Sequence, residues 1–139
     1  MVKPMVNRHI ELKVTSDAAN LAAVRKAVET FAATTGLSES AVNDLGLCVN
    51  ETLANIIRHA YEGRTDGPIE LRVEAHDDRV LIFIRDWGSG VDPSSVPQEP
   101  YDPLKPGGVG LMCIRQLMDE ISYTPQPDGM LTVMSKRRT

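Results

Sequence analysis

The chain has 139 residues, enough for one domain with a substantial hydrophobic core and too few for two ordinary domains. Hydrophobic residues make up 42% of it, which argues for a globular protein and against a disordered one. The net charge of −4, from 15 basic and 19 acidic residues, provides no broad basic field for nucleic acid or an anionic membrane. We therefore expect no direct nucleic-acid partner and no membrane partner.

The sequence also lacks the usual signs of export or membrane insertion. Its longest apolar runs are far shorter than a membrane span, and no signal-peptide pattern opens it. Cys48 and Cys113 lie in helical patterns among apolar neighbours without a short spacing between them. We interpret both as free core thiols rather than as a metal site or a disulfide. A cytoplasmic location is the resulting expectation.

The start of the chain predicts a strand followed by a helix. Residues 8–15, RHIELKVT, alternate strictly between polar and apolar side chains, as in a half-buried strand. Ser16 or Asp17 is suited to cap the next element, and Gly36 is suited to end it. The apolar face of that helix is expected to consist of Leu21, Val24, Val28 and Phe31.

A second helix, from the N-cap Ser38 to about residue 62, is predicted to have two different faces. Its apolar side chains recur every three or four residues and should pack on a core; they are Val42, Leu45, Val49, Leu53, Ile56 and Ala60. Glu51, Asn55 and His59 are spaced i, i+4 and i+8, so they should form another stripe that points away from the core. We interpret His59 as a structural hydrogen-bonding partner.

The next segment predicts a β-hairpin with a tight turn at residues 77–78. Residues 69–75 alternate in polarity, whereas residues 80–84, VLIFI, are continuously apolar. The second strand of the hairpin is therefore expected to be central and buried, with Asp86 standing at its end.

The end of the chain predicts a helix and two more strands. The helix opens at Gly107–Gly110 and runs to about residue 120, and the strands cover residues 121–123 and 130–134 around a short turn. The basic tail, residues 136–138, is expected to be solvated.

The elements thus follow the order β, α, α, β, β, loop, α, β, β, without an internal repeat, and we expect residues 1–139 to form a single domain. Adjacent strands joined by short turns indicate a mostly antiparallel sheet, and the helices should cover one face of it. The predicted fold class is an α/β two-layer sandwich of the α+β kind.

The long loop at residues 87–107 differs from the rest of the chain. It contains five prolines and shows no periodicity. A structureless connection of this length in a compact domain is often a lid or a binding loop.

Asp86 and the glycines after it are the first candidate cluster. A carboxylate at the end of a buried strand could accept a hydrogen bond from an exocyclic amine such as that of adenine, and the glycines would let a flat ligand approach. The alternative is an ordinary strand-end turn, in which Asp and Gly are both common. Alone, the D-x-G-x-G pattern favours the turn.

The other two clusters are the glycine run before the last helix and the polar stripe of the second helix. Glycines at a helix N-terminus offer free backbone N–H groups and a positive dipole end, which suit phosphate. The run matches neither the Rossmann fingerprint nor a Walker A loop, and a flexible turn is the alternative. The carboxylate of Glu51 could act as a general base and the amide oxygen of Asn55 could bind Mg²⁺, although each alone would be an ordinary solvated side chain.

Taken together and in this order, the three clusters resemble the N, G1 and G2 boxes of the GHKL ATPases. The matching stretches are NETLANIIRHAY at 50–61, DWGSGVDP at 86–93 and GGVGLMCIRQLMDEISY at 107–123. Within that superfamily the sequence is similar to the small anti-sigma factor serine/threonine kinases, over most of the chain. The resemblance implies the histidine-kinase-like Bergerat ATP-binding fold, with ATP and Mg²⁺ as its cofactors.

The resemblance also implies roles for individual residues. Glu51 matches the catalytic glutamate, which is expected to act as general base on the hydroxyl of a protein substrate. Asn55 matches the residue that coordinates Mg²⁺. Asp86 matches the aspartate that binds the adenine amine, with Gly88 and Gly90 beside the base.

Further nucleotide contacts are implied in the loop, the glycine turn and a late strand. Residues 91–107 match the ATP lid, in which Lys105 is the only basic residue and so the only lid candidate for stabilising the γ-phosphate. Gly108 and Gly110 match the glycines under the phosphates, Val109 and Leu111 beside them are further cofactor-binding candidates, and Thr132 matches a nucleotide-contacting threonine in a late strand. The family commonly has an Asn-containing turn before its last strand, whereas this chain has Asp128-Gly129-Met130.

We expect from this resemblance a protein serine/threonine kinase that acts as an anti-sigma factor. It would bind a sigma factor, phosphorylate an anti-anti-sigma antagonist of the STAS type, and work as a homodimer. The alternative is a nucleotide-binding regulatory module that holds partners without phosphoryl transfer. The ATPase part of a histidine kinase is disfavoured because no helical-hairpin domain precedes it and no histidine has a recognisable phosphoacceptor context. An α/β domain without a ligand would require all three boxes to be coincidental.

Overall fold

The computed structural model describes residues 8–89 and 110–138, and for residues 110–113 only the course of the backbone. The predicted ATP lid, residues 91–107, therefore lies outside the described residues. So do four candidate site residues, namely Gly90, Lys105, Gly108 and Val109.

Five strands form one sheet in the order β1-β2-β3-β5-β4, and every neighbouring pair is antiparallel. The strands are β1 (Arg8–Thr15), β2 (Pro68–Ala75), β3 (Arg79–Asp86), β4 (Glu120–Gln126) and β5 (Gly129–Arg137). Short turns join β2 to β3 and β4 to β5, as the alternating patterns predicted. The central strand is β3, which pairs with β2 on one side and with β5 on the other.

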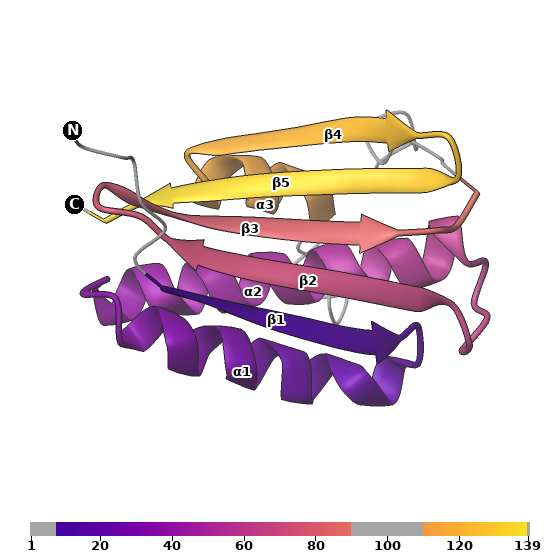
Figure 1. Ribbon diagram of the computed structural model, residues 1–139, viewed down its shortest axis with the longest axis horizontal. Helices are drawn as coiled ribbons and strands as arrows, with labels where there is room; N and C mark the ends of the chain where they lie inside the picture. Colours follow the sequence, from indigo (N-terminus) through magenta and orange to yellow (C-terminus); the bar gives the residue numbers. More distant parts are fainter. Residues whose placement is uncertain (1–7, 90–109, 139) are drawn as a thin grey trace.

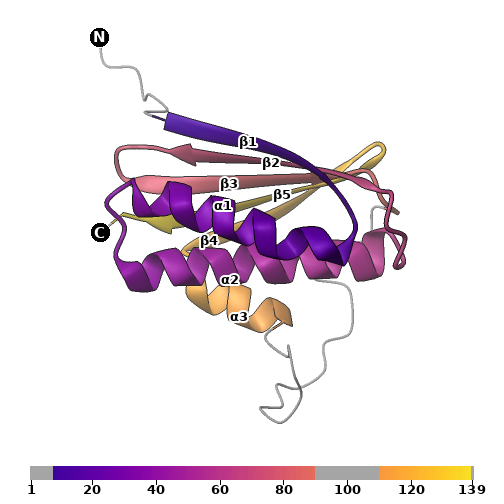
Figure 2. The same cartoon turned by 90° about the horizontal axis from the view of Figure 1, so that it is seen from below.

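The described helices lie together on one face of this sheet (Figures 1 and 2). They are α1 (Leu21–Ala33), α2 (Glu39–Asn55) and α3 (Gly110–Leu117), with a 3₁₀ turn at Ala18–Asn20 and a π-helix at Ile56–Ala60. Ser38 caps α2 as predicted, because its hydroxyl accepts a hydrogen bond from the Ala41 N–H at 3.1 Å. No described helix is long and apolar enough to cross a membrane.

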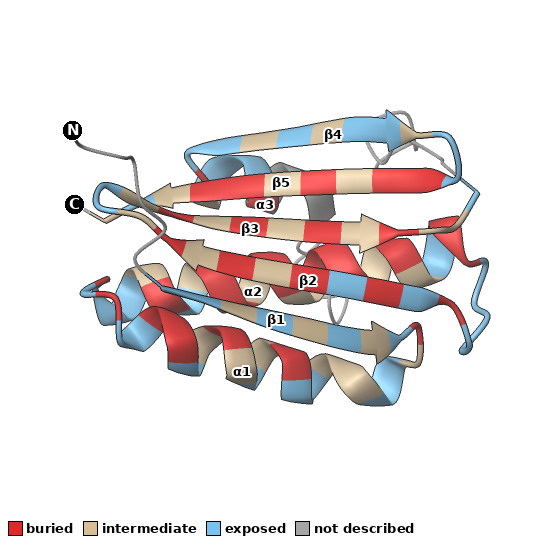
Figure 3. Cartoon of the chain, viewed as in Figure 1, coloured by how far each residue is buried: buried red, intermediate tan, exposed pale blue. Residues whose placement is uncertain are grey.

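The core lies between the sheet and the helices (Figure 3). Alternate residues of β2 and β3 point into it, and Leu45, Val49 and Leu53 of α2 meet them from the other layer. Cys48 also lies buried in this core. The predicted two-layer sandwich with helices on one face is confirmed.

The second helix differs from the prediction at its end. α2 stops at Asn55, and the next five residues form a π-helix, in which the Tyr61 N–H bonds to the Ile56 carbonyl at 3.0 Å. A π-turn holds one residue more than an α-turn, so the following side chains are rotated by roughly 100°. The π-helix changes the direction only of His59, which is exposed. Glu51 is buried and Asn55 is half-buried, so the prediction that this stripe points away from the core is wrong for Glu51.

The basic tail also differs from the prediction, because it is bound to the fold rather than solvated. The ammonium of Lys136 donates to the Leu117 carbonyl at 2.6 Å and lies 3.6 Å from the Asp44 carboxylate. The guanidinium of Arg138 donates to the His76 carbonyl at 2.9 Å and also to the Thr35 carbonyl. Main-chain carbonyls that lack a partner at helix and strand ends attract such cationic donors.

Candidate active site

Asp86 is the last residue of β3 and is 2% exposed, so its carboxylate lies within the protein on the side of the sheet that the helices cover. One carboxylate oxygen, Oδ1, accepts a hydrogen bond from the Gly88 N–H at 3.0 Å. Burial raises the pKa of Asp86 above 3.8, although the Gly88 bond and the charge of Arg85 partly oppose the shift. The site thus presents a fixed acceptor in a low-dielectric setting.

The chain after Asp86 turns from the sheet towards the end of the π-helix. The Ser89 N–H donates to the Ala60 carbonyl at 2.9 Å. A Cβ atom on Gly88 would lie 2.5 Å from that same carbonyl oxygen, so this approach requires glycine. The D-x-G pattern therefore has a specific packing function, beyond that of an ordinary turn.

Tyr61, which was not a candidate site residue in the sequence analysis, holds the same turn through its hydroxyl. The Trp87 N–H donates to this hydroxyl at 2.8 Å, and the hydroxyl donates to the Pro68 carbonyl at 2.5 Å. The ring lies against Gly67, where an added Cβ atom would come within 2.5 Å of it. At the level of sequence, Tyr61 is indistinguishable from any aromatic core residue at the end of a helix.

Arg85 attaches the β4–β5 turn to the Asp86 end of β3. Its guanidinium donates to the Asp86 carbonyl, forms an ion pair with Asp128, and lies 4.4 Å from the centroid of the Trp87 ring. The backbone of Gly129 comes so close that an added Cβ atom would lie 2.0 Å from the Asp86 carbonyl oxygen. Asp128 thus gives the turn an acidic partner for Arg85.

Glu51 and Asn55 lie one turn apart on α2, as predicted. Glu51 is buried with 7% of its surface exposed, and Asn55 is half-buried. The amide oxygen of Asn55 accepts a hydrogen bond from Nη2 of Arg58 at 3.1 Å. The end of α2 and the Asp86 end of β3 lie at the same end of the molecule (Figure 1).

Thr132 is 1% exposed and lies on the same face of the sheet as Asp86. Asp86 pairs with Met130 of β5, so Thr132, two residues further along that strand, is its diagonal neighbour. Such diagonal positions are roughly 7 Å apart. The structure therefore brings together Asp86, Gly88 and Thr132.

The described backbone of α3 begins at Gly110, the last glycine of the predicted helix start. The helix ends at Leu117 and not near residue 120 as predicted, because strand β4 begins at Glu120. Leu111 lies in its first turn. The other end of α3 is held by Lys136, which joins its last carbonyl to Asp44 of α2.

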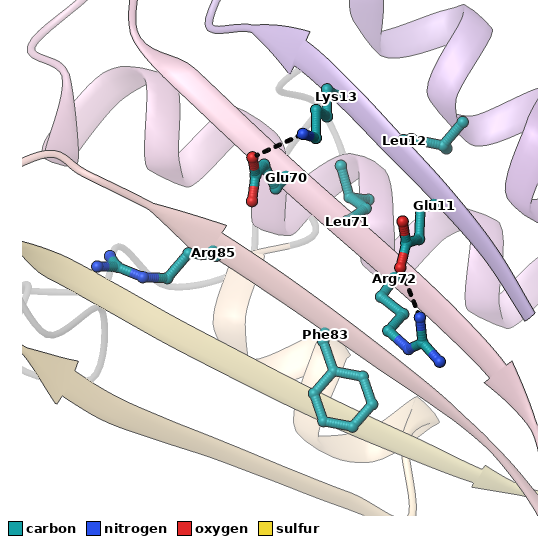
Figure 4. A pocket seen from close by; sticks show the side chains of 8 residues that line it. All are labelled: Glu11, Leu12, Lys13, Glu70, Leu71, Arg72, Phe83 and Arg85. Carbon is teal, nitrogen blue, oxygen red and sulfur yellow. Dashed lines mark hydrogen bonds and ion pairs between the residues drawn. The ribbon is translucent and has the colours of Figure 1, made fainter. Parts of the chain in front are cut away.

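A groove of about 300 Å³ lies on the face of the sheet opposite to that of Asp86 and Thr132 (Figure 4). Two ion pairs cross it, Lys13 with Glu70 at 3.6 Å and Arg72 with Glu11 at 2.5 Å. Its lining consists of Glu11, Leu12, Lys13, Glu70, Leu71, Arg72, Phe83 and Arg85. None of the predicted nucleotide-binding residues lines this groove.

The donor set on α2 is compatible with Mg²⁺ only if other ligands complete the coordination. Within the described residues no three His, Cys, Asp or Glu side chains gather as a metal site. Asn55 offers a half-buried amide oxygen, and magnesium is commonly held by one or two protein groups with waters and phosphates. Asn55 therefore fits a shared site that includes a nucleotide.

The chain is similar in sequence to known proteins. Residues 14–136 match the family described as the histidine kinase-like ATPase domain. The serine-protein kinase RsbW of Oceanobacillus iheyensis is 30% identical over 92% of this chain and 85% of its own length. The anti-sigma F factor of Clostridium beijerinckii is 28% identical over 96% of each chain.

Solved structures show the same fold. The RsbU and RsbW domains of Rv1364c from Mycobacterium tuberculosis superpose with a TM-score of 0.67 at 16% identity, over 94% of this chain. This chain covers 32% of that crystallised chain, so the likeness concerns one part of it. The histidine kinase domain of a blue-light activated kinase from Erythrobacter litoralis gives a TM-score of 0.56 over 87% of this chain.

The family match covers most of the chain, and the sequence relatives are matched over most of their own length. The chain therefore belongs to the histidine kinase-like ATPase domain family, as the three motifs predicted, and its curated relatives there include a serine-protein kinase and an anti-sigma factor.

Proposed function

We propose that this chain is an ATP-dependent protein serine/threonine kinase that acts as an anti-sigma factor in a partner-switching circuit. The observation that carries the proposal is the buried Glu51 one turn from Asn55, at the end of the molecule that also holds the buried carboxylate of Asp86. The names of the two relatives support the same assignment.

Asp86 is proposed to accept a hydrogen bond from the adenine amine. Its carboxylate is held by the Gly88 N–H, and the close contact of Gly88 with Ala60 leaves the turn without side-chain bulk. Gly90, Gly108, Val109, Gly110, Leu111, Thr132 and Lys105 are the further proposed nucleotide contacts.

Phosphoryl transfer depends mainly on positioning and charge stabilisation. We propose that Glu51 takes the proton of a substrate Ser or Thr hydroxyl while that oxygen forms a bond to the γ-phosphorus of ATP. The bond from that phosphorus to the bridging oxygen breaks, and ADP leaves. Asn55 would hold Mg²⁺, which neutralises charge on the phosphate oxygens when it is bound.

The partners follow from the same family assignment. The proposed phosphoacceptor is an anti-anti-sigma protein of the STAS type, and the proposed alternative partner is a sigma factor. We also propose a homodimer and a cytoplasmic location, where such partners would be found.

A Glu51→Gln variant tests the proposal most sharply, because it keeps the shape of the side chain and removes the proton acceptor. We expect phosphate transfer from ATP to a STAS-type protein of the same genome to fall by at least about 100-fold. The affinity for ATP should stay within about twofold. Transfer is measured by mass spectrometry of the phosphorylated Ser or Thr, and affinity by calorimetry.

Glu39→Gln is the matched control, because Glu39 is an exposed carboxylate in the first turn of the same helix. It should transfer phosphate as the wild type does. Equal rates of phosphate transfer in the Glu51 and Glu39 variants would refute the role of Glu51 as the general base. ATP binding without transfer to any STAS-type protein tested would favour the regulatory module that only binds nucleotide.

A further inference from the structure

Two consecutive residues at the end of the π-helix hold the turn that follows Asp86. The Ala60 carbonyl accepts from the Ser89 N–H, and the Tyr61 hydroxyl accepts from the Trp87 N–H. These contacts join the helix that carries Glu51 and Asn55 to the strand that carries the proposed adenine acceptor.

The register of the sheet shows what the hydroxyl does there. β2 and β3 pair up to Ile69 and Asp86, so the next residues along each strand, Pro68 and Trp87, should face each other. Instead of a direct pairing, the Tyr61 hydroxyl bridges the Trp87 N–H and the Pro68 carbonyl. The tyrosine therefore lies between the two strands and ends their ladder immediately after Asp86.

The chemistry of the three groups fixes the direction of both hydrogen bonds. A backbone N–H can only donate and a carbonyl can only accept, so the hydroxyl must do both. Tyr61 is 1% exposed. Burial raises the pKa of its hydroxyl above 10.0; the Trp87 bond opposes this shift and the charge of Asp86 adds to it. The hydroxyl therefore keeps its hydrogen for Pro68 at neutral pH.

The bridge sets the place where the backbone leaves the sheet, and the Asp86 carboxylate sits one residue before that place. After the bridge, the Gly88 N–H bonds back to the Asp86 carboxylate and the Ser89 N–H bonds to the Ala60 carbonyl, so the turn is fixed to the helix on the far side of Gly88 as well. A hydrogen bond to an exocyclic amine weakens steeply when its geometry is lost. A shift of this turn should therefore weaken the proposed hydrogen bond between Asp86 and the adenine amine.

We propose that Tyr61 is a positioning residue for base recognition: its hydroxyl, wedged between Pro68 and Trp87, fixes the orientation of Asp86 that selects a purine with a 6-amino group. This inference rests on the proposed adenine-binding role of Asp86. Tyr61 itself touches neither the nucleotide nor the reacting atoms in this account.

The test compares the affinities for ATP and inosine triphosphate, which carries a carbonyl where adenine carries its amine. Tyr61→Phe keeps the ring against Gly67 and removes only the hydroxyl. We expect the ATP preference of the wild type to fall roughly three- to tenfold, as for the loss of about one hydrogen bond. The Tyr61→Phe/Asp86→Asn double variant should show no lower preference than Asp86→Asn alone, because Tyr61 acts through Asp86.

Thr35→Val is the matched control for lost stability. It removes another buried hydroxyl, which donates to the Ala32 carbonyl at 2.6 Å, next to the hairpin end of β3 and far from Asp86. This variant should melt at a lower temperature and keep the full ATP preference. A merely structural Tyr61 would behave in the same way, so an unchanged preference in Tyr61→Phe overturns the inference.

The remaining outcomes separate the two proposals. If Asp86→Asn abolishes the ATP preference while Tyr61→Phe keeps it, the positioning role fails and the adenine role stands. If Asp86→Asn keeps the preference, both fail. Should Tyr61→Phe not melt cooperatively, hydrogen exchange on the wild type decides: the Trp87 amide should exchange as slowly as the amides of β3, and exchange at the rate of an exposed loop overturns the bridge.

Discussion

The two ends of β3 are held by similar contacts but have different consequences. At the Asp86 end, the side chains of Tyr61 and Arg85 bond to main-chain groups at the ends of β2 and β3 and at Trp87. At the Arg79 end, Arg138 bonds to the carbonyls of His76 and Thr35, and its own N–H bonds to the Asp78 carbonyl at 2.9 Å. Both ends satisfy backbone groups that the ladder leaves open.

Among the described residues, the Asp86 end differs from the Arg79 end in that it fully buries an ionisable carboxylate. Burial of a charge opposes folding, as the raised pKa of Asp86 indicates. At the Arg138 end, the described contacts are hydrogen bonds to main-chain carbonyls, which we expect to stabilise the fold. We infer that the Asp86 end of β3 serves ligand binding and that the Arg138 end serves stability. Substitutions at one end at a time test this difference.

The largest expected effect is on nucleotide binding at the Asp86 end. Asp86→Asn replaces a carboxylate acceptor with an amide, which cannot make the same charge-assisted bond to an amine. We expect the Kd for ATP to rise roughly 10- to 100-fold, the worth of one hydrogen bond to a charged group. An unchanged Kd in a calorimetric titration would show that Asp86 does not bind the nucleotide.

The next effect is on stability at the opposite end. Arg138→Met keeps the aliphatic stem and removes the donors to the His76 and Thr35 carbonyls, so the free energy of unfolding should fall by roughly 1–3 kcal/mol. The affinity for ATP should not change. Arg137→Met is the control, because Arg137 is exposed and its contact to Asp119 uses the backbone N–H. Equal losses in the two variants, measured by urea unfolding, would contradict the account.

The smallest effect is a gain in stability, again at the Asp86 end. Because the pKa of Asp86 is raised in the fold, the folded state favours the protonated form. Stability is therefore lost as the pH rises from the unfolded value near 3.8 through the folded pKa. Asp86→Asn has no such charge, so it should melt a few degrees above the wild type at pH 7, with the gap closing as the pH approaches 4. If Asp86→Asn is less stable than the wild type at pH 7, the predicted gain in stability is wrong.

Much of the fold could be predicted because its signals are local. The alternation in β1 and β2 and the helical spacing around Leu45 and Leu53 each report which face meets the core. The order of the elements and the glycine start of α3 followed in the same way. Asp86 could also be singled out, because a charged residue at the end of an apolar strand is unusual.

The contacts that hold the site could not be predicted, because they join distant parts of the chain. The end of α2 has the composition of a continuous helix, and its π-helical turn accompanies contacts of Ala60 and Tyr61 with residues 87–89. From the sequence alone, Arg85 and Arg138 are ordinary surface cations. The fold places Asp128 beside Arg85 and the Thr35 carbonyl beside Arg138, and neither partner is close in sequence.

The measurement that tests the central claim most directly is a calorimetric titration of ATP into the wild-type chain, with and without Mg²⁺. The account predicts micromolar binding that weakens clearly when Mg²⁺ is removed, since Asn55 and the nucleotide would share the ion. No binding at millimolar ATP would contradict the claim that Asp86, Glu51 and Asn55 form a nucleotide site.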